Sequence, residues 1–377
     1  MKYISRFWML LVACLAAALQ PLCTLNAAFG QRGDIDLFDT RTMLRALEQM
    51  KPVRTFLLDT FFKTVETSTT KNVDIDIQKG KRKLAPFVAP RMQGKVMDRL
   101  GFTTRSYTPP YVKPKMVTTA QDFLTRSMGE HIYQAGDTAA QRAAKQVGKD
   151  LAYLEEIITR REEWMASQLL QTGKVAIVGD GVDDEIDFGM DATHIITLTG
   201  NDLWSDQTNS TPLEDLRAWR RLILKDSGLN STDVIMGSDA IDSFLDHPDV
   251  QNKLDTRRID LGQIDPRQVP AGAIYYGRIK DVALDLWVYD EWYYDEDTST
   301  EKPLIDTKKV VMGSTQARTA KHYGAIQDLD FGGTASVPRF PKSWTEKDPS
   351  VRFIMVQSAP LVSLHQVDAF ICAAVLS

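Results

Sequence analysis

The most informative segment of the chain lies at residues 138–173 and reads TAAQRAAKQVGKDLAYLEEIITRREEWMASQLLQTG. Thr138 and Gln141 form a capping-box pattern at its start, and Gly173 is well placed to end a helix. One apolar face runs between them, made of Val147, Leu151, Leu154, Ile158, Met165 and Leu169. At 1.5 Å per residue the stretch predicts one helix on the order of 50 Å long. The heptad is not strict, so a coiled coil is the weaker interpretation.

A basic, proline-rich stretch precedes this helix at residues 73–115. It holds ten Lys or Arg and three Asp, and Val73, Ile75 and Ile77 alternate weakly, as in a strand edge. Excursions of this length are usually functional or disordered. A solvated basic hairpin is the simpler interpretation. The functional one is an arm that lies on an acidic neighbour, which an identical subunit would supply, because the rest of the chain is net acidic.

Residues 34–72 predict an N-terminal arm that packs on something else. Asp39 or Thr40 can cap a helix that Pro52 ends, and its apolar positions include Met43 and Leu47. A second apolar cluster follows at residues 55–62.

The first 33 residues resemble a secretory signal. Lys2 and Arg6 give a positive start, and an uncharged apolar run follows at residues 7–19. A helix needs about 20 apolar residues to span a bilayer comfortably, so no membrane span is expected. Either the protein is exported, or this segment is an extension that the folded protein does not need.

The second half predicts a layer of helices and strands. Thr211 and Pro212 begin a helix that Gly228 ends, a buried strand follows at residues 233–237, and Ser238 caps another helix. Further strands are expected at 282–288, 353–356 and 370–376. The acidic runs at 179–185 and 289–297 are interpreted as turns rather than as calcium, phosphate or acid–base sites.

The cysteines and histidines argue against a disulfide framework and against a metal site. The three cysteines form no CxxC pair, and the five histidines are scattered without an HExxH motif. The net charge of −5 argues against a protein whose main task is to grip nucleic acid, although contact with packaged DNA remains compatible with it.

Several short sequence motifs occur together in a specific order along the chain. They are YTPPYVKPK (107–115), KLDTRR (253–258), MGSTQAR (312–318), YGAIQD (323–328), PKSW (341–344), Asp348-Pro349 and VQSAPL (356–361). With them the chain resembles the phage lambda major capsid protein family from about Asp34 to Ser377. The first 33 residues fall outside that resemblance.

The resemblance implies an α+β, Hong-Kong-97-type phage capsid fold. Its parts would be a signal-like extension (1–33), an N-terminal arm (34–72), an extended β loop (73–115), a peripheral domain with a long spine helix (116–211), an axial domain (212–325) and a return to the peripheral domain (326–377). The implied function is self-assembly into pentamers and hexamers of an icosahedral head around double-stranded DNA, a structural role without enzymatic activity and without a cofactor. The protein would occupy the virion capsid, and the host cytoplasm during assembly.

The implied partners are further copies of the chain, with scaffolding, portal and decoration proteins and packaged DNA bound without sequence specificity. One alternative is an exported binding protein or hydrolase, which rests on residues 1–28 alone. Another is a cellular nanocompartment shell, which would share the fold but enclose enzymes.

The charges predict one contact between subunits, in which the extended loop of one copy lies over the spine of the next. The loop would contribute cations and the spine carboxylates, namely Lys79, Lys81, Arg82, Lys83 and Arg91 against Glu155, Glu156, Glu162 and Glu163. Such charge pairs set register more than they add affinity.

Overall fold

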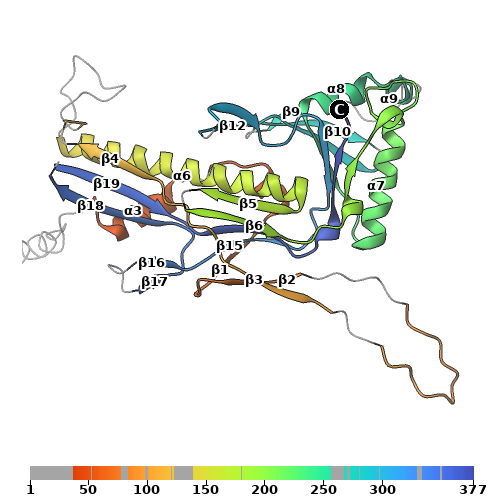
Figure 1. Cartoon of the computed structure of the whole chain (residues 1–377), viewed down its shortest axis with the longest axis horizontal. Coiled ribbons are helices and arrows are strands. Elements are labelled where there is room, and N and C mark those ends of the chain that lie inside the picture. The colour runs from red at the N-terminus through yellow and green to blue at the C-terminus, as the bar shows by residue number, and fades with distance from the viewer. Residues whose placement is uncertain are drawn as a thin grey trace, which may run out of the picture.

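A long helix and a seven-stranded sheet organise the chain, with an extended loop projecting from one edge (Figure 1). The computed structural model describes residues 37–51, 53–77, 84–97, 101–119, 121–122, 139–179, 181–255, 267–269, 272–279, 281–296, 298–328, 333–348 and 350–377. Helices and sheets are both present, as the predicted α+β class requires.

Helix α6, Ala139–Thr172, confirms the predicted 34-residue spine. Gly173 ends it with φ at +70°, a conformation that glycine adopts without strain. A Cβ at this position would also collide with the Met190 side chain. Thr138, the predicted cap, lies outside the described residues.

The central sheet has the order β7-β21-β14-β8-β11-β10-β9. Its strands are β7 Ile195–Thr197, β8 Asp233–Met236, β9 Arg267–Val269, β10 Ala273–Ile279, β11 Leu284–Tyr289, β14 Lys309–Gly313 and β21 Phe370–Ala374. Pairing is parallel between β7 and β21 and between β8 and β11, and antiparallel elsewhere.

Each face of this sheet is buried against helices. In β8, Val234 and Met236 face one apolar cluster while Ile235 faces the other, as the two-residue period of a strand requires. The first cluster includes residues of α7 Pro212–Asp226 and α8 Ser238–Asp246. The second includes residues of α4 Leu57–Phe61 and the C-terminal half of α6. Helix α9, Pro248–Asp255, follows α8.

The N-terminal half of α6 contributes to a separate core. Helix α3, Thr40–Gln49, buries Met43 there beside Leu151, Leu154 and Ile354. The accompanying sheet has the order β18-β19-β4, with β4 Lys115–Thr119, β18 Phe340–Lys347 and β19 Ser350–Gln357. A further sheet, β1-β15-β20, consists of β1 Thr64–Thr67, β15 Thr319–Tyr323 and β20 Pro360–Leu364.

Four two-stranded ribbons complete the described structure. They are β2 Val73–Ile77 with β3 Thr103–Tyr107, β5 Lys174–Gly179 with β6 Val182–Asp187, β12 Trp292–Asp295 with β13 Thr300–Pro303, and β16 Ile326–Asp328 with β17 Gly333–Ala335. Short 3₁₀ turns lie at Ala192–His194, Gly200–Asp202 and Val367–Ala369. The described residues of the two acidic runs lie in β hairpins, β5–β6 and β12–β13, as the sequence predicts.

Two expectations about the segments need correction. The prediction that residues 326–377 return as a whole to the peripheral domain is wrong for β21, which lies between β7 and β14 in the central sheet. Its strand is buried on both faces, which suits an inner position. The arm, residues 34–72, packs on its own chain in its described part, because α3 and α4 both contact α6. The other domain boundaries stay predictions.

Candidate assembly interface

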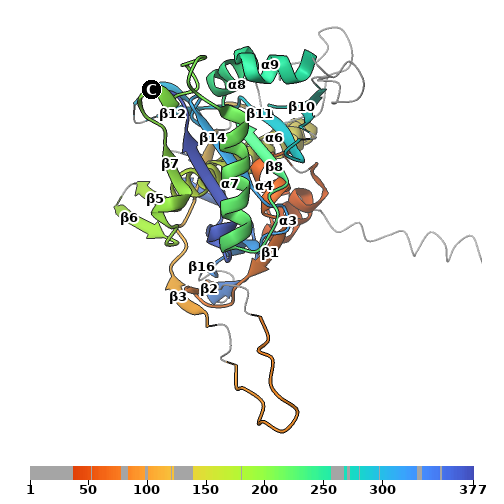
Figure 2. The same cartoon turned by 90° about the vertical axis from the view of Figure 1, so that its right-hand side faces the viewer.

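The extended loop is a β ribbon whose outer part projects away from the body. Strands β2 and β3 pair from Val73↔Tyr107 to Ile77↔Thr103, and in both views the described segment 84–97 lies clear of every other labelled element (Figures 1 and 2). Val73, Ile75 and Ile77 are buried, so the ribbon is rooted in the core. The loop has a fixed base and a free outer part.

The outer part of the loop exposes apolar side chains. Phe87 is fully exposed at 106%, and Leu84, Val96 and Met92 are 93%, 89% and 71% exposed. Large apolar side chains gathered on one exposed segment mark an interaction site more often than isolated ones do. The segment 84–97 also holds Arg91 and Lys95 and no acidic residue.

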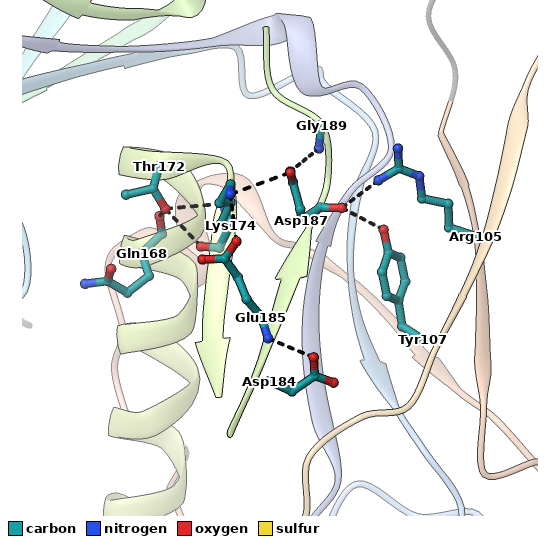
Figure 3. A network of polar contacts seen from close by, with 9 residues as sticks. All are labelled: Arg105, Tyr107, Gln168, Thr172, Lys174, Asp184, Glu185, Asp187 and Gly189. Carbon is teal, nitrogen blue, oxygen red and sulfur yellow. Dashed lines mark hydrogen bonds and ion pairs between the residues drawn. The ribbon is translucent and has the colours of Figure 1, made fainter. Parts of the chain in front are cut away.

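A polar network ties the base of the loop to the end of the spine (Figure 3). Arg105 Nη1 and the Tyr107 hydroxyl each donate to the Asp187 carbonyl oxygen at 2.8 Å. The Asp187 side chain accepts from the Gly189 N–H at 2.7 Å and lies 3.8 Å from Lys174 Nζ. This network holds the base of the loop against the segment that follows the spine.

Lys174, the first residue of β5, joins the same network. Its ammonium contacts Glu185 at 2.6 Å, and this hydrogen bond and charge hold the pKa of Lys174 above its ordinary value. A second fastening lies on β2, where His365 Nδ1 is 3.0 Å from the Asp76 carbonyl oxygen. Because a carbonyl only accepts, Nδ1 carries the proton in this contact.

The structure separates the predicted loop cations into two groups. Arg91 is described and exposed. Lys79, Lys81, Arg82 and Lys83 lie outside the described residues. The contact between subunits that these five residues were expected to make stays a prediction.

Two of the four predicted spine carboxylates do not face outward. Glu163 is 3% exposed and accepts from the backbone N–H groups of Phe56, Leu57 and Leu58 at 2.7–3.1 Å. Burial raises the pKa of Glu163, and these three N–H donors oppose that shift. Its carboxyl oxygens cap the start of α4, so Glu163 is not available to a neighbouring subunit.

Glu162 belongs to a second buried network. Its carboxylate receives Arg339 Nη1 at 2.7 Å and the Tyr323 hydroxyl at 3.2 Å, and its side chain is only 4% exposed. Arg339 Nε also donates to Glu155 at 2.8 Å. Burial alone would lower the pKa of Arg339, but Glu162 and Glu155 more than offset it and leave that pKa above its ordinary value.

Glu156 is the spine carboxylate that faces outward. It pairs with Arg160 one turn along the helix at 2.7 Å, and both side chains are nearly half exposed. Of the four predicted carboxylates, Glu162 and Glu163 are therefore buried within their own chain, and Glu155 is largely covered.

The sequence carried a signal for only part of this arrangement. Glu162 is four residues after Ile158 and three before Met165, so it falls on the apolar stripe of the helix. Arg339 has no comparable signal, because its partners lie far away in the sequence.

The described residues offer no metal site and no membrane-spanning helix. Within them, no three His, Cys, Asp or Glu side chains are grouped to hold a metal ion. Nor does any helix found there combine the length and apolar character needed to cross a bilayer.

Comparison with known proteins decides the family. Residues 39–375 match the model of the family described as phage major capsid protein E. The chain belongs to this family. The P21 prophage-derived major head protein of Escherichia coli O6:H1 strain CFT073 is 32% identical over 348 residues, which are 89% of this chain and 98% of that protein. The major capsid protein of Escherichia phage lambda is 30% identical over 345 residues, again 89% and 98% of the two chains.

Solved structures agree on the fold. A crystal structure of a prophage capsid protein from Escherichia coli CFT073 superposes with a TM-score of 0.69 at 21% identity, covering 89% of this chain and 99% of that one. A phage-related protein from Bordetella bronchiseptica RB50 gives a TM-score of 0.53 at 13% identity, covering 90% and 98%. The predicted Hong-Kong-97-type capsid fold is confirmed, and the protein is a phage or prophage major capsid protein. The exported binding protein or hydrolase is not favoured.

Proposed function

We propose that this major capsid protein forms pentamers and hexamers that close into an icosahedral head around double-stranded DNA. Its role is structural, without catalysis and without a cofactor. The observation that carries the proposal is the extended loop, which is anchored at its base and whose apolar side chains are not covered by any part of the chain that the structure describes.

The loop is suited to contact another copy of the chain. Burying a Leu, Phe, Met or Val side chain contributes about 1.5–3 kcal/mol, so the exposed residues of the loop can supply a large part of an association energy. Its cations then set the register against outward carboxylates of the neighbour, among which Glu156 is the one that the spine still offers.

The remaining partners follow from the family. A scaffolding protein, a portal and a decoration protein would join the shell, and packaged DNA would contact it without sequence specificity. Assembly would take place in the host cytoplasm, and the mature protein would reside in the virion.

Electron microscopy and sedimentation of the purified full chain test this proposal. We expect closed particles of uniform size that sediment far ahead of the subunit. A chain that stays monomeric over a wide range of concentration and salt, alone and with its scaffolding protein, would refute self-assembly.

The contents of particles made in the host distinguish the phage head from a nanocompartment. Nuclease-protected double-stranded DNA supports the head. A protein cargo without DNA supports the nanocompartment.

A further inference from the structure

The β12–β13 hairpin carries an exposed aromatic face that the described part of the chain leaves uncovered. Trp292 is 46% exposed and Tyr294 is 61% exposed. Tyr293, between them, packs against the core, so the strand alternates as a half-buried strand should. The outward face therefore holds two large aromatic rings two residues apart.

Cross-strand pairing places further residues on this outward face. Trp292 is opposite Pro303, and Tyr294 is opposite Glu301. Residues directly opposite in an antiparallel pair point to the same side. The outward face thus combines two aromatic rings, a proline and a carboxylate.

The hairpin is strongly acidic, and its single lysine lies on the inward side, where it pairs with a carboxylate of the hairpin. Residues 289–303 hold six acidic residues and one lysine, Lys302. Lys302 is opposite Tyr293, on the inward side, and its ammonium lies 2.5 Å from Asp295. The outward face is therefore left with a negative potential around its rings.

The outer part of the extended loop has the complementary chemistry. Residues 84–97 are apolar and basic, contain Pro86 and Pro90, and lack an acidic residue. Extended proline-containing segments dock on exposed aromatic rings, and Arg and Lys are attracted to the faces of Trp and Tyr. The loop supplies an extended, apolar and basic segment, and the hairpin supplies exposed aromatic rings and carboxylates, so the two surfaces are complementary.

The two surfaces lie on opposite edges of the subunit. In Figure 1 the hairpin, labelled at β12, lies on the edge formed by α6, and the loop leaves from the other edge; Figure 2, turned about the vertical axis, keeps the same separation. A ring of identical subunits is built from a head-to-tail contact between two different surfaces. Donor and acceptor on opposite edges meet this requirement, whereas a loop folding back on its own hairpin does not.

The hairpin is also continuous with the outward part of the spine. A small crevice beside its root is lined by Glu156 and Arg160 of α6 together with Tyr289 and Glu291. A segment lying on the hairpin would reach Glu156 without leaving this surface.

We propose that the outward face of the β12–β13 hairpin, centred on Trp292 and Tyr294, is the surface that receives the extended loop of a second copy of the chain. The inference rests on the proposed self-assembly and names the acceptor within it. Apolar residues of the loop, Phe87 foremost, cover the two rings. Arg91 and Lys95 lie among the carboxylates of the hairpin.

Photo-crosslinking of assembled particles tests the contact. Phe87 is replaced by p-benzoylphenylalanine in the full chain, and isotope-labelled and unlabelled copies are mixed before assembly. After irradiation, mass spectrometry should find position 87 joined to residues 289–303 of a different copy. Particles that form normally but crosslink only elsewhere overturn this inference and leave the proposed function standing. Failure of the unmodified chain to form particles overturns both.

A charge exchange provides an independent test. Arg91→Glu with Lys95→Glu, or Glu296→Lys with Glu301→Lys, should each lower particle yield about tenfold or more, since like charges then face each other. All four changes together should restore most of the yield. Asp242→Lys with Asp246→Lys, on exposed positions of α8, is the matched control and should leave the yield within about twofold. A quadruple variant as defective as the worse pair would contradict the contact.

Discussion

Replacing Arg339 by methionine should be among the most damaging single changes in this protein. The substitution keeps much of the apolar stem and removes the guanidinium that bridges two carboxylates at 2.7 and 2.8 Å. The Glu162 side chain, only 4% exposed, would then be a buried charge without its counterion. Removing one partner of a buried pair in this way costs about 3–5 kcal/mol.

The other carboxylate adds less to this cost. The Glu155 side chain is 24% exposed and can regain contact with water when Arg339 is removed. The Tyr323 hydroxyl continues to donate to Glu162, which limits the loss at that end. We therefore expect a total near 3–5 kcal/mol, a large part of the 5–15 kcal/mol that holds a typical domain folded.

Urea unfolding of the unassembled subunit, followed by tryptophan fluorescence, measures this cost. Adding Glu162→Gln to Arg339→Met should recover part of it, because the unpaired charge is then gone. Glu156→Gln is the matched control: the same helix and a 2.7 Å bond to an arginine, but a side chain that is 45% exposed. Its expected cost is about 0.3–0.5 kcal/mol. Equal losses from Arg339→Met and Glu156→Gln would show that burial does not set the value of these pairs.

Three further outcomes are expected. Burial raises the pKa of the Cys372 thiol to about 12. Cys372 should therefore resist iodoacetamide near pH 8 in the folded subunit and react fully in urea, as measured by peptide mapping. Rapid labelling without denaturant would contradict its burial. Burial holds the pKa of His322 below its ordinary value, so protonation favours the unfolded chain. The stability that neutral His322 contributes should be fully present above about pH 6.5 and should fall as the pH drops below it. His322→Gln should flatten this slope in unfolding measured from about pH 7.5 to 5, and an unchanged slope would assign it to other groups. Gly237→Ala should destabilise the folded subunit by several kcal/mol, because a Cβ there would overlap the Thr307 carbonyl. Gly148→Ala, in open space within α6, should stabilise it by about 0.5–1 kcal/mol. Thermal melts in which both variants shift the melting temperature in the same direction would refute this.

Local signals predicted much of the fold. The spine helix ends where Gly173 indicates, and α7 begins at Pro212 as its Thr-Pro start indicates. The strands around 233 and 284 and the two acidic hairpin turns also lie where turn chemistry and alternation place them. Each of these signals acts within a few residues, so the sequence alone is enough to read it.

The rest of the fold depends on pairing between residues that are far apart in the sequence, which local sequence signals do not predict. β21 looks like any buried strand in the sequence, and nothing near it says that its neighbours are β7 and β14. For the candidate interface, the predicted contact rests on charge, and a charged side chain is indeed exposed at Arg91 and Glu156. Glu163 is instead buried, and its donors at the start of α4 lie more than a hundred residues away in the sequence. Burying a carboxylate is unfavourable unless such donors exist, and only the folded structure shows them.

The position of β21 between β7 and β14 has a consequence for how a subunit folds during its synthesis. Ile195 of β7 pairs with Cys372 of β21, so β7 leaves the ribosome long before its partner is made. At roughly 5–20 residues per second this wait lasts on the order of ten seconds or more. Until β21 arrives, the sheet is split and its unpaired strand edges are open to wrong partners. A nascent chain that has not yet supplied this strand lacks its finished core, so we expect the subunit to reach its folded state only after residues 370–374 have been made.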